Sequence, residues 1–259
     1  MITITNYVKA ESLEQAYELN QKRANRILGG MMWMRLGKGR VQTAVDLSGL
    51  GLDTIEENET EFKIGCMCSL RSLELHTGLN TYFNNAIRES VRHIVGTQFR
   101  NQATVGGSIY GRFGFSDILT CFLALDSYVE LYKGGVVPVS EFVNIERDKD
   151  ILVGVIIKKD GCRVKYLTER AAATDFPIIA CAVSNVGKSW KVSVGARPMK
   201  AALVSEVTEI HNSEEAAGFA KKMAEQYTFG TNMRGSKEYR KHLAETLIRR
   251  SVISLMEEC

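Results

Sequence analysis

The sequence has no apolar run that approaches the length of a membrane-spanning helix, which needs about 20 such residues. Its first residues, Met1 to Asn6, carry neither the basic stretch nor the apolar stretch of a secretory signal. These two absences predict a cytoplasmic protein that does not enter a membrane.

Metal-binding spacings are also missing. Among the six cysteines only Cys66 and Cys68 lie close together, and Cys121 and Cys181 stand in apolar surroundings typical of core positions. The four histidines are scattered along the chain. A zinc site or an iron–sulfur cluster cannot be built from such spacings, so we expect no metal centre and reduced thiols.

Two other features that would point to a function class are absent. The 33 basic and 30 acidic residues give a net charge of only +3, too balanced to favour nucleic acid as a partner. The sequence offers no Ser/His/Asp or Cys/His grouping, no isolated carboxylate pair, and no Rossmann-type Gly-x-Gly-x-x-Gly followed by an acid. When side chains supply no reactive set, a bound cofactor carries the chemistry and the protein orients it.

The stretch from Phe99 to Leu131 is the best candidate for holding such a cofactor. It is expected to begin as an extended run, turn at Gly106-Gly107, pass an aromatic loop, and enter an apolar segment at Ser116-Asp117. Glycines let a backbone approach a ligand closely, and successive free N–H groups form an anion site. The pattern predicts a cradle for a phosphate-bearing cofactor, although a glycine pair is also ordinary turn chemistry and Asp117 could simply cap a helix.

A second glycine pair gives a second candidate contact. A short strand at Arg26–Leu28 ends in Gly29-Gly30 and is followed by an amphipathic turn that starts with Met31 and Met32. Glycines at the N-terminus of a helical turn present free amides to a phosphate. On its own this pair is equally compatible with a plain turn.

Hydrophobic patterning divides the chain, whose length allows one to three domains, into three parts. Residues 1–55 predict a small α/β unit, and residues 56–158 predict a second unit of strands and helices. A charged turn at Lys158–Gly161 marks a boundary. Residues 159–259 predict three strands, at 163–167, 178–185 and 189–196, and two helices capped by Ser213 and Ser236.

The phrase Arg100-Asn101-Gln102-Ala103-Thr104-Val105-Gly106-Gly107-Ser108-Ile109, followed by Ser116-Asp117-Ile118-Leu119, resembles the FAD-binding (medium) subunit of molybdenum hydroxylases. This family includes xanthine dehydrogenase and carbon monoxide dehydrogenase. The Gly29-Gly30 bend resembles the family's Ala-Gly-Gly-Thr-Asp phrase, but Met31 and Met32 stand where a hydroxyl and often an acid are expected.

The resemblance implies an α+β fold: a two-subdomain PCMH-type FAD-binding domain followed by a C-terminal three-stranded antiparallel sheet with helices. Carried over by position, it assigns a set of residues to the cofactor, with Ile151 and Leu152 near the flavin ring. The set is Leu28, Gly29, Gly30, Met31, Met32, Thr104, Gly106, Gly107, Ser108, Tyr110, Gly111, Ser116, Asp117, Ile151 and Leu152.

The function implied is that of an electron-transfer subunit. FAD would receive electrons from [2Fe–2S] clusters of a small partner subunit and pass them to NAD, while a large partner subunit holds the molybdopterin. Two alternatives stay open at this point. One is a redox-inactive interaction subunit whose flavin site has decayed, suggested by Met31 and Met32; the other is a stand-alone flavin oxidase, which would need a covalent attachment His or Cys beside the glycine bends.

Overall fold

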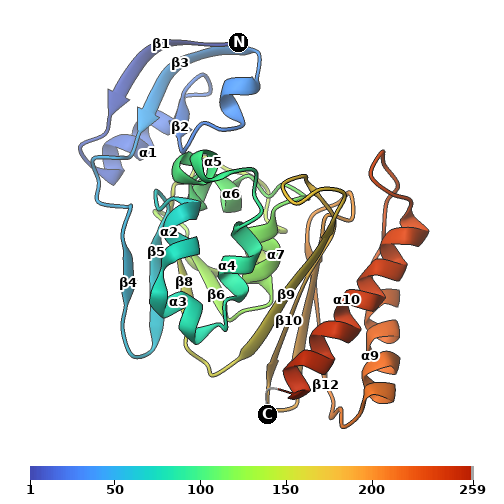
Figure 1. Ribbon diagram of the computed structural model, residues 1–259. Helices are drawn as coiled ribbons and strands as arrows, with labels where there is room; N and C mark the ends of the chain where they lie inside the picture. The colour runs from blue at the N-terminus through green and yellow to red at the C-terminus, as the bar shows by residue number, and fades with distance from the viewer. Residues whose placement is uncertain (258–259) are drawn as a thin grey trace.

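The chain forms three β-sheets, which follow one another along the sequence (Figure 1). The computed structural model describes residues 1–257. In Figure 1 the N-terminal sheet lies above the middle sheet, and the C-terminal sheet stands beside the middle part. The predicted α+β architecture is confirmed.

The N-terminal part is a small parallel sheet with one helix packed on it. Its elements are β1 (Ile2–Lys9), α1 (Leu13–Gln21), β2 (Arg26–Leu28), the 3₁₀ helix η1 (Met34–Leu36) and β3 (Gly39–Asp46). The strand order is β1-β3-β2. Ser12 caps α1 by accepting a hydrogen bond from the Gln15 amide at 3.1 Å, and the Gln15 side chain accepts one from the Glu11 amide. The helix ends at Gln21, because the next residue is already extended.

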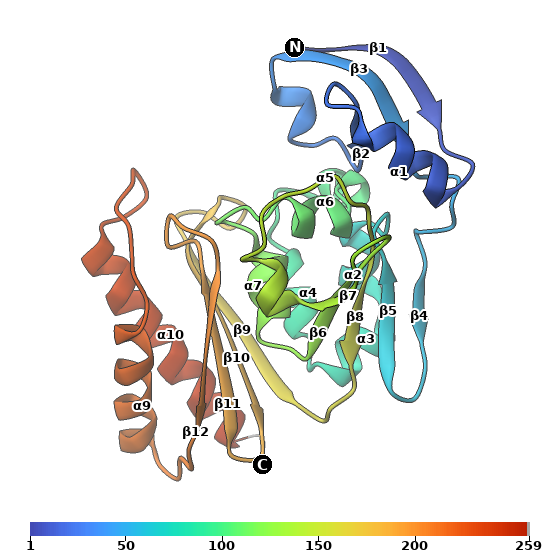
Figure 2. The same cartoon turned by 180° about the vertical axis from the view of Figure 1, so that it is seen from behind.

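The middle part is built on a five-stranded antiparallel sheet. Its strands are β4 (Ile55–Glu57), β5 (Glu61–Gly65), β6 (Ser127–Leu131), β7 (Gly135–Pro138) and β8 (Leu152–Lys158). They lie in the order β4-β5-β8-β6-β7, so the last strand inserts between the second and the third. The long connection from β5 to β6 is helical and covers one face of the sheet (Figure 2). Its helices are α2 (Leu70–Leu75), α3 (Thr77–Tyr82), α4 (Ala86–Val91), α5 (Thr97–Gln102), α6 (Val105–Tyr110) and α7 (Asp117–Leu123), and α8 (Val139–Phe142) follows β7.

The region around Gly106 and Gly107 is helical, where the sequence predicted an extended run and a turn. Thr104 caps α6 by accepting a hydrogen bond from the Gly107 amide at 3.2 Å. A Cβ on Gly106 would lie 2.8 Å from the carbonyl oxygen of Cys66, so this glycine lets the start of α6 pack directly against the residue that follows β5. The turn prediction is wrong because close helix packing selects glycine as strongly as a turn does.

The C-terminal part has four strands, not the predicted three. They are β9 (Arg163–Arg170), β10 (Pro177–Val186), β11 (Ser189–Gly195) and β12 (Ala202–Val207), in the antiparallel order β12-β11-β10-β9. The additional strand, β12, is an edge strand with partly exposed side chains, so its sequence lacks a clear two-residue alternation. The helices α9 (Ser213–Glu225) and α10 (Lys237–Glu257) follow; Asn212, rather than the predicted Ser213, caps α9, and Ser236 accepts a hydrogen bond from the third residue beyond it at the start of α10.

The C-terminal sheet is covered on both faces, and this fixes where it meets the middle part. Along β10, Ile179 and Cys181 pack toward α9 and α10, while Ala180 and Ala182 join the core of the middle part. Figure 1 accordingly shows β9 and β10 between α7 and α10. Among residues 1–257 no helix is both long enough and apolar enough to cross a bilayer. Five cysteines are buried and free within the same range, and Cys259 lies outside it.

Candidate functional site

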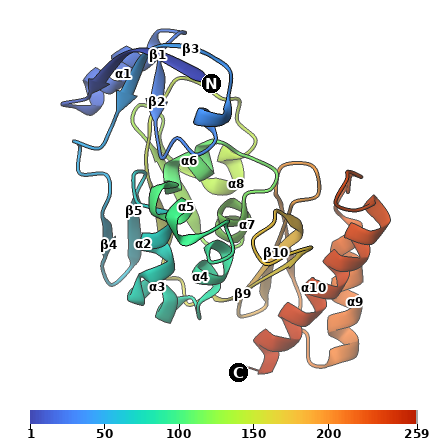
Figure 3. The ribbon, with the colours of Figure 1, turned by 45° about the horizontal axis from the view of Figure 1, so that its top comes forward.

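The two glycine pairs predicted to hold a cofactor lie side by side. A Cβ on Gly29 would stand 2.8 Å from Oγ1 of Thr104, and one on Gly30 would stand 1.8 Å from the carbonyl oxygen of Gln102. Only glycine permits so close an approach between two backbones. Figure 3 shows the end of β2 above α5 and α6, where the N-terminal sheet meets the middle part.

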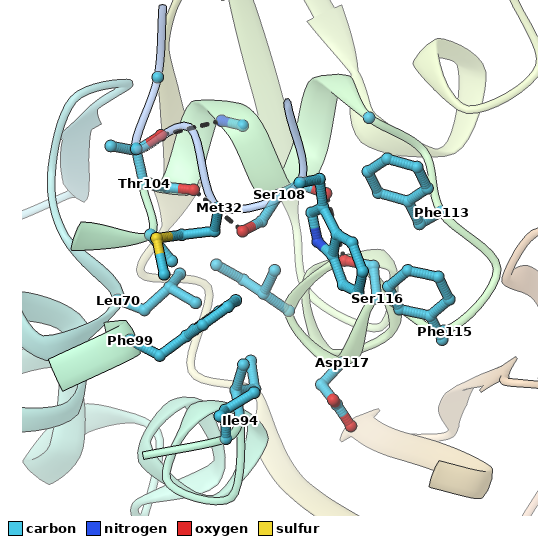
Figure 4. A pocket seen from close by; sticks show the side chains of 18 of the residues that line it. Met32, Leu70, Ile94, Phe99, Thr104, Ser108, Phe113, Phe115, Ser116 and Asp117 are labelled. Atoms are coloured by element: carbon cyan, nitrogen blue, oxygen red, sulfur yellow. Dashed lines mark hydrogen bonds between the residues drawn. The ribbon is translucent and has the colours of Figure 1, made fainter. Parts of the chain in front are cut away.

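A cavity of about 460 Å³ opens beside this contact. That size is within the range of cofactor sites. Its wall comes from all three parts of the chain: the segment from Ile27 to Met34, the segment from Ala103 to Ile118, and a C-terminal loop from Arg170 to Phe176. In Figure 4 the side chains form two groups, one apolar with Met32, Leu70, Ile94 and Phe99, the other with Phe113, Phe115, Ser116 and Asp117.

Most residues assigned to the cofactor from the sequence line this cavity. They are Gly29, Gly30, Met31, Met32, Thr104, Gly107, Ser108, Tyr110, Gly111, Ser116 and Asp117. Their contact with a cofactor stays a prediction.

The other assigned residues do not line it. Leu28 packs with Val41 and Ala44 inside the N-terminal part. Gly106 lies behind the cavity wall, against Cys66, and Ile151 and Leu152 are buried in the core of the middle part. An apolar strand residue at the cavity and one in the core look alike in sequence, which is why the pattern could not separate them.

The bend after β2 presents free backbone donors. Within residues 1–257, no group accepts a hydrogen bond from the amides of Gly29 to Trp33. Met31 has a left-handed backbone with φ +58°, which is uncommon for a residue other than glycine. Successive N–H groups around a left-handed residue form a concave site for an anion. The bend is thus suited to a phosphate, even though Met31 and Met32 bring no hydroxyl.

The hydroxyls on the opposite wall are used to fix the wall itself. Ser108 Oγ donates to the Thr104 carbonyl at 2.9 Å, and Ser116 Oγ donates to the Ser108 carbonyl at 3.2 Å. Ser116 also caps α7 by accepting from the Leu119 amide at 3.3 Å. The bond from Ser116 to Ser108 therefore ties the start of α7 to α6.

Asp117 is buried, with 4% of its surface exposed, and is paired across the boundary to the C-terminal part. Its Oδ1 accepts hydrogen bonds from Tyr166 Oη and from Arg170 Nη2, each at 2.5 Å. Burial raises the pKa of the Asp117 carboxyl, and the Arg170 guanidinium and Tyr166 hydroxyl beside it oppose that shift. The helix cap proposed as an alternative role belongs to Ser116 instead.

Five aromatic side chains on the cavity wall were not assigned from the sequence, and four of them, all except Phe99, pack together. Trp33 lies 5.3 Å from Phe115 and 5.7 Å from Phe176 between ring centroids, and Phe113 stacks on Phe115 at 5.2 Å. Arg234 lies over the Phe176 ring at 5.0 Å. The several aromatic residues that follow Gly107 were the only sequence signal that could have pointed to this cluster. That they meet Trp33 and Phe176 depends on the fold.

A second, more open cavity of about 760 Å³ adjoins the first. The two share Met32, Val95 and Phe99, and the second adds polar side chains from Arg35 and Gln98. The shared residues place the second cavity next to the apolar group of side chains in the first.

Comparison with known proteins identifies the family. Residues 3–159 match the family described as the FAD binding domain in molybdopterin dehydrogenase, which is more than half of the chain. The chain belongs to this family. The match covers both glycine pairs and ends shortly before the C-terminal sheet begins.

Similar proteins cover almost the whole chain. The uncharacterized protein YgfM of Escherichia coli (strain K12) is 23% identical over 255 residues, covering 95% of this chain and 94% of YgfM. The fold is that of a chain of carbon monoxide dehydrogenase from Hydrogenophaga pseudoflava (TM-score 0.87, 17% identity, 100% of this chain and 99% of that one). A chain of quinoline 2-oxidoreductase from Pseudomonas putida 86 has it too (TM-score 0.85, 17% identity, 99% and 98% covered). The predicted fold class and family are thereby confirmed.

Proposed function

We propose that this chain binds FAD in the cavity between its three parts and acts as the electron-transfer subunit of a xanthine dehydrogenase-type molybdenum hydroxylase complex. One observation carries the proposal: two glycine pairs from separate subdomains, one in a bend and one in a helix, touch beside one cavity, with free amides on one wall and a carboxylate on the other. Neither the N-terminal nor the middle part could form that site alone.

The residues at the cavity fit FAD. The free amides of Gly29 to Trp33 would hold the pyrophosphate. Asp117, whose Oδ1 is taken up by Tyr166 and Arg170, would accept a hydrogen bond from a ribityl or ribose hydroxyl at its other oxygen. Trp33 and Phe115 offer flat apolar faces to a ring system.

Bound FAD would supply stepwise electron acceptance and two-electron release, which no side chain of the cavity provides. We further propose that electrons arrive from [2Fe–2S] clusters of a small partner subunit and leave to NAD, and that a large molybdopterin subunit converts the substrate. Membership in a molybdopterin dehydrogenase family supports such partners. We propose a cytoplasmic location for the complex.

One feature favours a second candidate, a redox-inactive subunit whose flavin site has decayed. Met31 and Met32 stand at the phosphate-binding bend, and they replace groups that would hydrogen-bond a phosphate. The free amides of the bend speak against decay, because backbone donors do not depend on these side chains. The stand-alone oxidase is disfavoured, because no His or Cys among the described residues lines the cavity to carry a covalent flavin.

The test is to purify the chain and record its absorbance from the near-ultraviolet to the blue. We expect a yellow protein with about one FAD per chain, which NADH bleaches and which reduces an artificial dye. A colourless chain that does not take up added FAD would contradict the proposal and favour the decayed site. Purine oxidation by the chain alone would contradict the proposal that a separate molybdopterin subunit converts the substrate.

A further inference from the structure

The carboxylate of Asp117 is held from one side by the C-terminal sheet. Tyr166 and Arg170 are four residues apart on β9, so their side chains project from the same face of the strand. Both donate to the same oxygen, Oδ1, at 2.5 Å. The first turn of α7 is thereby tied to a strand from another part of the chain.

The second oxygen of Asp117 is left for a ligand. Among the described residues, none donates a hydrogen bond to Oδ2. Asp117 lines the cavity, and its unpaired Oδ2 is accessible rather than enclosed by protein atoms. An ionised carboxyl oxygen on a cavity wall accepts hydrogen bonds from hydroxyl groups.

Arg170 extends this arrangement along the wall. Its side chain is 6% exposed, and its second nitrogen, Nη1, donates to the Asp175 carbonyl at 2.5 Å. The Asp175 carboxylate in turn binds Arg234 at 3.1 Å. Asp117, Arg170 and the loop that carries Phe176 therefore form one connected wall of alternating charge.

We propose that Tyr166 and Arg170 are positioning residues for FAD, which orient the Asp117 carboxylate so that Oδ2 accepts a hydrogen bond from a hydroxyl of the cofactor. This inference rests on the proposed function and adds to it that the C-terminal sheet sets cofactor affinity through Asp117. Tyr166 itself does not line the cavity, so any effect it has on FAD passes through the residue it holds.

The first test compares two tyrosine variants of the full chain. Tyr166→Phe removes the hydroxyl that binds Asp117, while Tyr227→Phe removes a buried hydroxyl that donates to the Val192 carbonyl at 2.7 Å in the core formed with α9 and α10. We expect Tyr166→Phe to raise the FAD dissociation constant about three- to tenfold and Tyr227→Phe to leave it within about twofold. Thermal unfolding of the FAD-free variants checks that both fold.

The second test shows whether Tyr166 acts through Asp117. In an Asp117→Asn background the Tyr166→Phe substitution should change the FAD dissociation constant by less than about twofold, because the carboxylate that it positions is gone. The same loss in both backgrounds would overturn the inference. If Asp117→Asn does not fold, Arg170→Lys is compared with Arg170→Met instead. We expect Arg170→Lys, which keeps the positive charge, to retain most of the FAD affinity and Arg170→Met to lose it. Equal losses of affinity in the two variants would overturn the inference.

The outcomes separate this inference from the proposed function. A wild-type chain that binds no FAD overturns both. A wild-type chain that binds FAD, with Tyr166→Phe binding it equally well, overturns the positioning role alone.

Discussion

Gly29 and Thr104 touch: a Cβ added to the glycine would lie 2.8 Å from the threonine hydroxyl oxygen. That hydroxyl caps α6, so the bend after β2 rests on the start of a helix in the next subdomain. Because both residues line the cavity, a change in the packing of the two subdomains must also change the shape of the cavity.

Gly30→Ala tests this coupling. The new methyl group would fall 1.8 Å from the Gln102 carbonyl oxygen and 2.9 Å from the Cα of Ala103, and both are backbone atoms that cannot rotate away. We expect the subdomains to separate locally, with a loss of about 1–3 kcal/mol in the free energy of unfolding and a large loss of FAD retention. Urea unfolding and bound-flavin absorbance measure the two effects.

The control is Gly218→Ala in α9, where a Cβ meets no atom within 4 Å. There we expect a gain of about 0.5–1 kcal/mol, because alanine favours a helix interior. A Gly30→Ala protein that is as stable and as yellow as the wild type would refute the close contact.

The sequence predicted those parts of the site that rest on local chemistry. Ser116 before α7 and the glycine bend after β2 can be recognised within a few residues of chain, and the structure places both at the cavity. Gly106 and Leu152 were assigned to the cofactor but lie behind the wall or in the core. The distinction depends on which neighbour a residue meets, and one sequence does not contain that information.

The missed residues have the same physical origin. Tyr166 reaches Asp117 only because the C-terminal sheet packs against α4 and α7, and Phe176 reaches Trp33 only because the C-terminal loop folds over the bend after β2. β12 was missed because an edge strand needs no strong alternation of apolar residues. Contacts between distant segments thus set the limit of the sequence-based prediction.

Trp33 should report on the cavity. The chain has two tryptophans: Trp33 lies on the cavity wall and Trp190 is buried against Phe219 in the C-terminal core. We expect added FAD to quench the emission of Trp33 and to leave that of Trp190 almost unchanged. Titration of Trp33→Phe with FAD should show little quenching, whereas a Trp190→Phe protein should keep it. Equal quenching in the two variants would place FAD elsewhere.

The backbone of Val95 is strained, and a substitution that relieves this strain should stabilise the protein. It has φ +50°, which a β-branched residue rarely adopts, and its side chain is 48% exposed, so little burial is lost on substitution. We expect Val95→Asn to raise the free energy of unfolding by about 1 kcal/mol, because asparagine tolerates the left-handed region. Val136→Asn is the control: Val136 is 58% exposed on β7 without positive φ, so this change should be neutral or destabilising. A Val95→Asn variant less stable than wild type would argue against strain at this loop.

Arg100, the first residue of the phrase that resembles flavoproteins, has a structural role that should be visible as pH dependence. Its Nε binds Glu74 Oε2 at 2.7 Å, and its Nη1 donates to the Ile94 carbonyl at 3.2 Å, so it ties α5 to α2 and to the cavity wall. The exposed fractions of the two paired side chains are only 6% and 9%. Replacing Arg100 by Met leaves the buried Glu74 carboxylate with Arg71, at 2.8 Å, as its remaining cationic partner, and we expect a loss of about 1–3 kcal/mol at pH 7.

Lowering the pH should remove the stabilisation that the Arg100–Glu74 pair provides. Burial alone would raise the pKa of Glu74, but hydrogen bonds from Arg100 and Arg71 outweigh it, and the pKa is lowered in the folded chain. Because the pKa of Glu74 is lower in the folded chain than in the unfolded chain, the ionised carboxylate stabilises the fold fully above its unfolded-state pKa of about 4.3. This stabilisation is lost as the pH falls through the folded-state pKa. Urea unfolding between pH 7 and pH 3 should therefore show the wild type converging on Glu74→Gln only in the acidic part of that range. A difference between the two proteins that stays constant down to pH 3 would show that the carboxylate at position 74 is not stabilised by Arg100 and Arg71.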